Sequence, residues 1–149
     1  MALKEQLTAD MKTAMKEHDK NRLAVIRMVR GAVRQAEIDG GHKELGDEEV
    51  ISVISKEVKM RRDSIEEFKK GGRTDLVEGT QAEIDILMAY LPKQLTEDEV
   101  RALVAEAVEA TGAKTPKDMG KVMGQLMPKV KGRADGKRVS TLVKSMLQG

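Results

Sequence analysis

The sequence predicts an all-α fold, with a four-helix N-terminal part followed by a smaller three-helix C-terminal lobe. Apolar residues recur at spacings of three and four along almost the whole chain of 149 residues, which is the period of an amphipathic helix. The chain has one Phe, one Tyr and no Trp against ten Met, so its core must be built from aliphatic and unbranched side chains. No segment shows the strict alternation of a half-buried strand.

Four helices are expected before Pro92. The apolar residues of the first two fall within residues 3–15 and 23–36, with a polar break between them. A third helix is expected from the acidic residues 47–49, which suit the positive end of a helix dipole, to the glycine pair 71–72. Thr74 is then the expected cap of the fourth helix.

Pro92 is the expected domain boundary, because it cannot continue the fourth helix. The chain then divides into an N-terminal helical domain, residues 1–91, and a C-terminal three-helix domain, residues 92–149. Thr96 and Glu99 have the spacing of a capping box at the start of the fifth helix. Pro92 thus ends the fourth helix, and the capping box shows where the fifth begins.

The sixth helix is expected to open at residues 115–118 and to close at Pro128, and Asp135 is the expected cap of the seventh. The segment G-K-V-M-G (residues 120–124) lacks the spacing of a phosphate-binding P-loop, so we interpret it as a close crossing with another helix. Three methionines share one face of this helix, and we favour core packing over a partner-binding groove for them. They are Met119, Met123 and Met127.

Residues that could carry catalysis are few. His18 and His42 are the only imidazoles, and neither has a second ligand at metal-binding spacing, so both are expected to be solvated. The nucleophile motif G-x-S-x-G is absent, and adjacent acidic pairs on a helix point to different faces. We expect no metal and no cofactor.

Charge is distributed unevenly along the chain. Residues 1–91 carry a net charge of −2 and residues 92–113 a net charge of −3, whereas residues 114–149 carry nine Lys and Arg against two Asp and Glu, a net charge of +7. An asymmetry of this kind predicts a basic surface near the C-terminus. Because aromatic residues are so scarce, we do not expect binding of single-stranded nucleic acid by base stacking.

The candidate site lies in this basic region, around a glycine-containing turn that leads into the last helix. Its residues are Lys129, Lys131, Gly132, Arg133, Gly136, Lys137 and Arg138. Backbone amides at a helix N-terminus hold anions, and glycines let a phosphate approach closely. The site is expected to extend along the sixth helix through Lys114, Lys117 and Lys121. The alternative is an ordinary solvated face, which composition alone makes equally plausible.

A second group of cations lies on the second and third helices. It comprises Arg27, Arg30, Arg34, Lys59, Arg61 and Arg62. Here we favour an ordinary surface, because acidic neighbours such as Glu37, Asp63 and Glu66 can neutralise these charges.

The expected location is the cytoplasm. Cysteine is absent, which suits a reducing compartment. No apolar run approaches the roughly 20 residues that cross a bilayer. We therefore expect a soluble, cytoplasmic protein without a membrane partner.

Three segments resemble a known family. They are residues 56–73 (K-E-V-K-M-R-R-D-S-I-E-E-F-K-K-G-G-R), residues 90–96 (Y-L-P-K-Q-L-T) and residues 118–136 (D-M-G-K-V-M-G-Q-L-M-P-K-V-K-G-R-A-D-G). They resemble the YqeY proteins, which are similar to the C-terminal region of GatB, the B subunit of the tRNA-dependent amidotransferase. Gly79 and Thr80 depart from the helix formers usual at this point in the family, which leaves a break in the fourth helix open.

The resemblance implies an all-helical fold with a small three-helix tail, the region that in GatB is associated with holding tRNA. It places amide transfer and glutamine hydrolysis in other parts of that enzyme. We therefore expect a non-catalytic module that binds tRNA or another structured RNA through the basic C-terminal patch. A label of carbon–nitrogen ligase with glutamine as amido-N-donor would then be inherited from the longer protein.

Two other functions remain open at this stage. The first is a protein-interaction accessory of an amidotransferase or another translation enzyme, which would use the methionine row and the face of Gly120 and Gly124 if they are exposed. The second is amide transfer by the chain alone.

Overall fold

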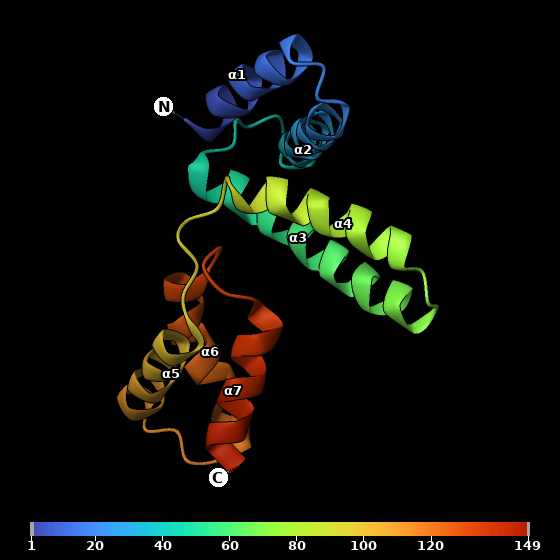
Figure 1. Cartoon of the computed structure of the whole chain (residues 1–149). Helices are drawn as coiled ribbons and strands as arrows, with labels where there is room; N and C mark the ends of the chain where they lie inside the picture. The colour runs from blue at the N-terminus through green and yellow to red at the C-terminus, as the bar shows by residue number, and fades with distance from the viewer. Residues whose placement is uncertain (1, 149) are drawn as a thin grey trace. The chain divides into compact units, whose positions relative to one another are not determined.

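The computed structural model describes residues 2–148, and within them it contains seven α-helices, one short 3-10 helix and no strand (Figure 1). The all-α prediction is confirmed. The chain divides into two compact units, Met1–Leu91 and Pro92–Gly149. That residues 1–91 and 92–149 are separate domains stays a prediction.

The first unit contains four helices. They are α1 (Leu3–Lys16), α2 (Lys20–Asp39), α3 (Asp47–Lys70) and α4 (Thr74–Met88). All four contribute to one aliphatic core, in which Leu7 of α1, Ile26 of α2, Ile54 of α3 and Leu87 of α4 are almost completely buried. The stripe of apolar residues at three-and-four spacing on each helix is thus the face turned toward this core.

The first and second helices are separated by only three residues. His18 adopts a positive φ of 56°, and the side chain of Asp19 accepts a hydrogen bond from the Arg22 amide at 3.1 Å. This cap satisfies an amide that the first turn would otherwise leave unpaired. For that reason α2 begins at Lys20, before the first apolar residue of its periodic pattern.

Helix α4 differs from the sequence prediction at its start. Arg73 occupies the cap position without a side-chain hydrogen bond, and Thr74 is the first helical residue, so the prediction of Thr74 as the cap is wrong. The amides of Leu76 and Val77 both donate to the Arg73 carbonyl at 3.1 Å, which starts the helix one residue earlier. The helix is continuous through Gly79, and Figure 1 shows it lying alongside α3.

The second unit contains three α-helices and the short 3-10 helix. They are α5 (Glu97–Thr111), η1 (Pro116–Asp118), α6 (Met119–Val130) and α7 (Gly136–Gln148). Its separate core is formed by residues of all three α-helices, and its most deeply buried members are Val104, Val122, Leu126, Val139 and Val143.

The capping box at the start of α5 is confirmed. The Thr96 hydroxyl accepts from the Glu99 amide at 3.1 Å, and the Glu99 carboxylate accepts from the Thr96 amide at 3.2 Å. At the other end, Gly112 has a φ of 66°, a left-handed conformation that glycine adopts without a steric penalty.

Two predictions about α6 are wrong. Pro128 does not close the helix, which continues through Val130, because Val130 is only 1% exposed and its burial in the core holds the last turn in place. Gly120 and Gly124 do not mark a close helix crossing, since a Cβ atom built on either would have no atom within 4 Å. Both glycines are exposed.

Candidate functional site

The basic residues predicted near the C-terminus surround the turn between α6 and α7. Gly132 is buried and has a φ of 74°, so it allows the reversal of the chain after α6. The Gln94 side-chain amide donates to the Gly132 carbonyl at 2.8 Å, and the Leu95 amide donates to the Arg133 carbonyl at 2.8 Å. The segment before α5 therefore holds this turn in one conformation.

Arg133 points from the turn toward the same segment. Its Nε donates to the Lys93 carbonyl at 3.4 Å. The hydrogen bonds with Thr96 hold the pKa of the Glu99 carboxyl below its ordinary value, and the charges of Lys93 and Arg133 add to this effect. Lys93 is thus a cation of this site that the sequence analysis did not include.

The predicted cations differ in their pairing. Lys129 forms an ion pair with Glu106 of α5 at 3.7 Å, and Arg138 forms one with Glu97. Glu97 also pairs with Arg101 at 3.2 Å, and the hydrogen bond from Arg101, together with Arg138, holds the pKa of the Glu97 carboxyl below its ordinary value. Two of the five predicted phosphate ligands therefore already have a carboxylate partner.

Lys131 and Lys137 have no carboxylate partner. Both side chains are exposed, and neither forms an ion pair with any residue in the described range 2–148. The Lys137 amide at the start of α7 donates to the Asp135 carboxylate at 3.1 Å, as expected for a cap. We call Lys131, Arg133 and Lys137 the turn cluster.

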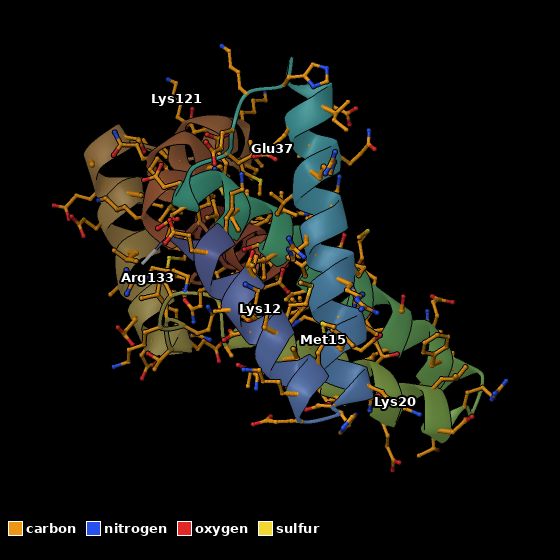
Figure 2. The ribbon with its side chains drawn as sticks, turned by 90° about the horizontal axis from the view of Figure 1, so that it is seen from above. Lys12, Met15, Lys20, Glu37, Lys121 and Arg133 are labelled. Atoms are coloured by element: carbon orange, nitrogen blue, oxygen red, sulfur yellow. The ribbon has the colours of Figure 1, made fainter. Side chains whose placement is uncertain are left out.

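The predicted extension of this site lies at the other end of α6. Lys114, Lys117 and Lys121 surround η1 and the first turn of α6, and Figure 2 labels Lys121 and Arg133 at well-separated points. The Asp118 carboxylate accepts from the Lys114 amide at 3.1 Å. The amides of Lys114 and Thr115 hold the pKa of Asp118 below its ordinary value, and Lys121 adds to this effect. The structure does not join the extension to the turn cluster along α6.

A second cationic surface lies in the first unit. A groove of about 660 Å³ runs between α1 and α2. Arg27, Arg30 and Arg34 line it from α2, and Lys4 lines it from α1. The sequence analysis favoured an ordinary surface here, neutralised by acidic neighbours such as Glu37, but Glu37 pairs with Lys4 of α1 at 2.6 Å. The segment of residues 11–34 alone carries seven Lys and Arg against two Asp and Glu, and this count would have indicated the cationic surface.

On α3, Arg61 is neutralised by carboxylates, although these are not the ones named in the sequence analysis. Arg61 forms ion pairs with Glu57 at 2.8 Å and with Glu83 of α4 at 3.4 Å. Its side chain is only 16% exposed. Arg61 is therefore part of the packing between α3 and α4.

Neither histidine lies in a cluster of metal-ligating residues. His18 and His42 are exposed and have positive φ angles of 56° and 64°. Within residues 2–148, no group of three or more His, Cys, Asp or Glu side chains is placed to hold a metal ion. None of the helices in the same range combines the length and the apolar character needed to cross a bilayer.

The methionine row of α6 is only partly buried. Met119 and Met123 are half-buried against the core of the second unit, and Met127 is 40% exposed. Core packing thus accounts for the first two residues. Met127 belongs to the surface, beside the open positions of Gly120 and Gly124.

Comparison with known proteins gives consistent matches. The family described as Yqey-like protein matches residues 4–147. A protein of Pyrenophora tritici-repentis named "Altered inheritance of mitochondria protein 41, mitochondrial" is 36% identical over 149 residues, covering 95% of this chain and 79% of that protein. Its namesake in Lachancea thermotolerans is 40% identical over 85 residues, covering 57% of this chain and 46% of that protein. The namesake in Saccharomyces cerevisiae is 27% identical over 125 residues, covering 80% and 68%.

These relatives correct one expectation. They are named as mitochondrial proteins, which contradicts the cytoplasmic location expected from the sequence. That expectation depended on the lack of cysteine and of long apolar runs, and these features do not distinguish one reducing, aqueous compartment from another.

The family match extends over nearly the whole chain and agrees with the all-helical structure. The chain belongs to the Yqey-like protein family.

Proposed function

We propose that this protein is a binding module that holds tRNA or another structured RNA through the turn cluster of its C-terminal unit, without catalysing a reaction on it. The proposal rests chiefly on one observation. Lys131 and Lys137 are exposed and form no ion pair within residues 2–148, and they flank a turn at Gly132 and Arg133 that two hydrogen bonds from residues 94 and 95 fix in place. Because the backbone of this turn is already held, less of it has to be ordered when the flanking cations meet phosphates.

The kind of recognition follows from the residue types. Lysine and arginine contact phosphates, and such contacts position a nucleic acid without reading its bases. We therefore propose recognition by shape. The resemblance of the sequence to the tRNA-holding region of GatB makes tRNA the first RNA to test.

The test is the salt dependence of tRNA binding. Each neutralised phosphate contributes about −0.9 to the slope of log K against log salt for a duplex. The turn cluster should therefore account for about −2.7. The variant Lys131→Ala/Arg133→Ala/Lys137→Ala should lose most of that slope, as measured by filter binding at two salt concentrations.

A matched control removes the same charge elsewhere. Lys12, Lys16 and Lys20 are exposed on α1 and at the start of α2, where Figure 2 labels Lys12 and Lys20. The variant Lys12→Ala/Lys16→Ala/Lys20→Ala should bind tRNA with nearly the wild-type slope. Equal losses in the two variants would show that only net charge matters, and an unchanged slope in the turn variant would refute the proposal.

A second candidate function uses the outer face of α6. Met127 is 40% exposed there, next to two glycines with open space above them. Such a face suits a protein partner, and we propose a translation enzyme such as an amidotransferase as that partner. Co-purification with amidotransferase subunits should be lost in Gly124→Arg. A chain that turns over ATP, glutamine and misacylated tRNA by itself would instead establish catalysis.

A further inference from the structure

One exposed face of α6 carries positive charge and no carboxylate. The sequence has no acidic residue between Asp118 and Asp135. Lys121, labelled in Figure 2, lies in the first turn of α6, and Lys131 lies at its end. Both are exposed, and neither forms an ion pair within residues 2–148. The Asp118 carboxylate accepts from the Lys114 amide at 3.1 Å and not from the Lys121 side chain. Both ammonium groups are therefore available to an external anion.

The two lysines lie on the same side of the helix. Four exposed residues recur at spacings of three, four and three, which places them along one face. They are Lys121, Gly124, Pro128 and Lys131. The ten residues from the first lysine to the second correspond to a rise of about 15 Å. Lys129, which pairs with a carboxylate of α5 at 3.7 Å, lies off this face. The face therefore has a free cation near each end.

Between the lysines, the helix presents a hydrogen-bond acceptor without its usual donor. Pro128 lies inside α6 and has no N–H, so the helical hydrogen bond to the Gly124 carbonyl four residues earlier is missing. No side chain within residues 2–148 donates to this carbonyl. Gly124 is exposed, and a Cβ atom built on it would have no atom within 4 Å. The carbonyl oxygen is therefore open to a donor from outside the chain.

We propose that this face of α6 lies against the minor groove of an A-form RNA duplex. This groove is wide and shallow, and it displays 2′-hydroxyl groups between the phosphates of its two strands. Lys121 and Lys131 contact phosphates on either side, and the Gly124 carbonyl accepts a hydrogen bond from a 2′-hydroxyl group. The inference rests on the RNA binding proposed above, and it narrows the ligand to a double-helical part of the RNA.

The unpaired carbonyl is what favours an RNA duplex over other occupants. DNA has no 2′-hydroxyl group to donate, and reading its major groove requires long polar side chains that reach the base edges. The face of α6 has none between Lys121 and Lys131. The backbone N–H groups of a partner helix already have acceptors within that helix. Such a helix packed closely on α6 would bury the Gly124 carbonyl without a backbone donor, which is unfavourable.

The first experiment measures binding of the full chain to fluorescein-labelled duplexes of about 16 base pairs, long enough to present two successive minor grooves. The RNA duplex should bind more tightly than a single RNA strand or a DNA duplex of the same sequence at the same salt concentration. An RNA duplex with fluorine in place of each 2′-hydroxyl group keeps the A form but cannot donate. It should bind about threefold to tenfold more weakly, and equal affinity for the two RNA duplexes would overturn the proposal.

Two variants test the face itself. Pro128→Ala restores the N–H that pairs the Gly124 carbonyl, so it should raise the melting temperature and reduce the affinity for the RNA duplex to that for the 2′-fluoro duplex. Gly124→Leu adds a strong helix former whose Cβ meets no other atom. Its side chain holds the lysines away from the phosphates, so binding should weaken by about tenfold or more. Gly79→Leu, at an equally open glycine of α4, is the matched control and should bind as the wild type does.

A third variant separates this inference from the proposed function. Lys121→Ala should reduce the slope of log K against log salt for the RNA duplex by about 0.9, which binding through the turn cluster alone does not predict. If tRNA binds through the turn cluster while Lys121→Ala and Gly124→Leu change nothing, the inference is wrong and the proposed function stands. If no RNA binds, both are wrong. If Gly124→Leu binds RNA normally but loses a protein partner, the face is a protein interface and the inference is overturned.

Discussion

The hydroxyl group of Tyr90 is the most strongly perturbed ionisable group in the first unit. It donates to the Asp10 carboxylate at 2.5 Å, and burial, followed by the charge and hydrogen bond of Asp10, raises the pKa of Tyr90 to about 12. Tyr90 is the only tyrosine and there is no tryptophan. Near-ultraviolet absorbance of tyrosinate therefore reports on this one site.

We predict a loss of stability at alkaline pH that Tyr90 controls. A raised pKa in the folded state means that the contribution is complete below the unfolded value of about 10. It is then lost as pH rises through the folded value of about 12. Tyr90→Phe should remove this dependence and cost about 1 kcal/mol at neutral pH. Urea unfolding at several pH values measures both effects, and a native tyrosinate titration centred near the ordinary value would contradict the prediction.

The ion pair between Lys4 and Glu37 gives stability a second dependence on pH, of the opposite sign. The pKa of Glu37 is lowered, chiefly by the Lys4 hydrogen bond, so its contribution to stability is present above the unfolded value of 4.5 and is lost as pH falls below it. Glu37→Gln should be less stable at neutral pH and should lose less on acidification. Glu5→Gln, at an exposed position of the same helix pair, is the control. Parallel acid curves for Glu37→Gln and the wild type would show that the pair contributes nothing.

At the scale of a helix, sequence signals that act through the backbone were sufficient to predict where a helix begins. The acidic start of α3 and the capping box of α5 lie where the sequence placed them. The errors at Pro128 and Gly124 have a different origin. The end of α6 is decided by the burial of Val130, and the face of α6 that meets its neighbours is decided by tertiary packing. Neither is encoded in a local motif.

The open glycines in helices allow a direct test of this view. Gly79 lies within α4 with no atom near its potential Cβ, so Gly79→Ala should stabilise the protein by about 1 kcal/mol. Gly112→Ala is the contrasting variant, because its φ of 66° is strained for alanine, and it should destabilise. Thermal unfolding followed by circular dichroism compares the two, and equal shifts in one direction would contradict the reasoning.

The candidate sites were predictable to different degrees. The positions of Lys131 and Arg133 in the turn before α7, and of Lys137 in its first turn, follow from their order in the sequence. The pairing of Arg138 with Glu97, which is 41 residues away, was not predictable, nor was the groove formed when α1 packs on α2. Both depend on contacts between helices that no local pattern specifies.

At the scale of the whole molecule, the chain has two separate hydrophobic cores. Tyr90 belongs to the core of the first unit, and Leu126, which is fully buried, belongs to the second. Circular dichroism follows the helices of both units, whereas tyrosine fluorescence follows only the first. The two signals together thus distinguish unfolding of one unit from unfolding of the whole chain.

We predict that Leu126→Ala separates these two signals. Creating a cavity at this position should destabilise the second unit by about 2–5 kcal/mol. Part of the circular dichroism signal should then be lost at a lower temperature. The unfolding temperature reported by Tyr90 fluorescence should not change. Leu87→Ala, in the core of the first unit, should move the Tyr90 transition instead. Coincident transitions in both variants would show that the two units unfold cooperatively as one.

The hydrogen bonds from residues 94 and 95 to the turn at residues 132 and 133 have a mechanical consequence. They tie the start of the C-terminal unit to the same few residues that carry the turn cluster. A ligand that displaced the Arg133 backbone would break the hydrogen bond from the Leu95 amide to the Arg133 carbonyl. Faster deuterium exchange at the Leu95 amide would register the loss of this hydrogen bond.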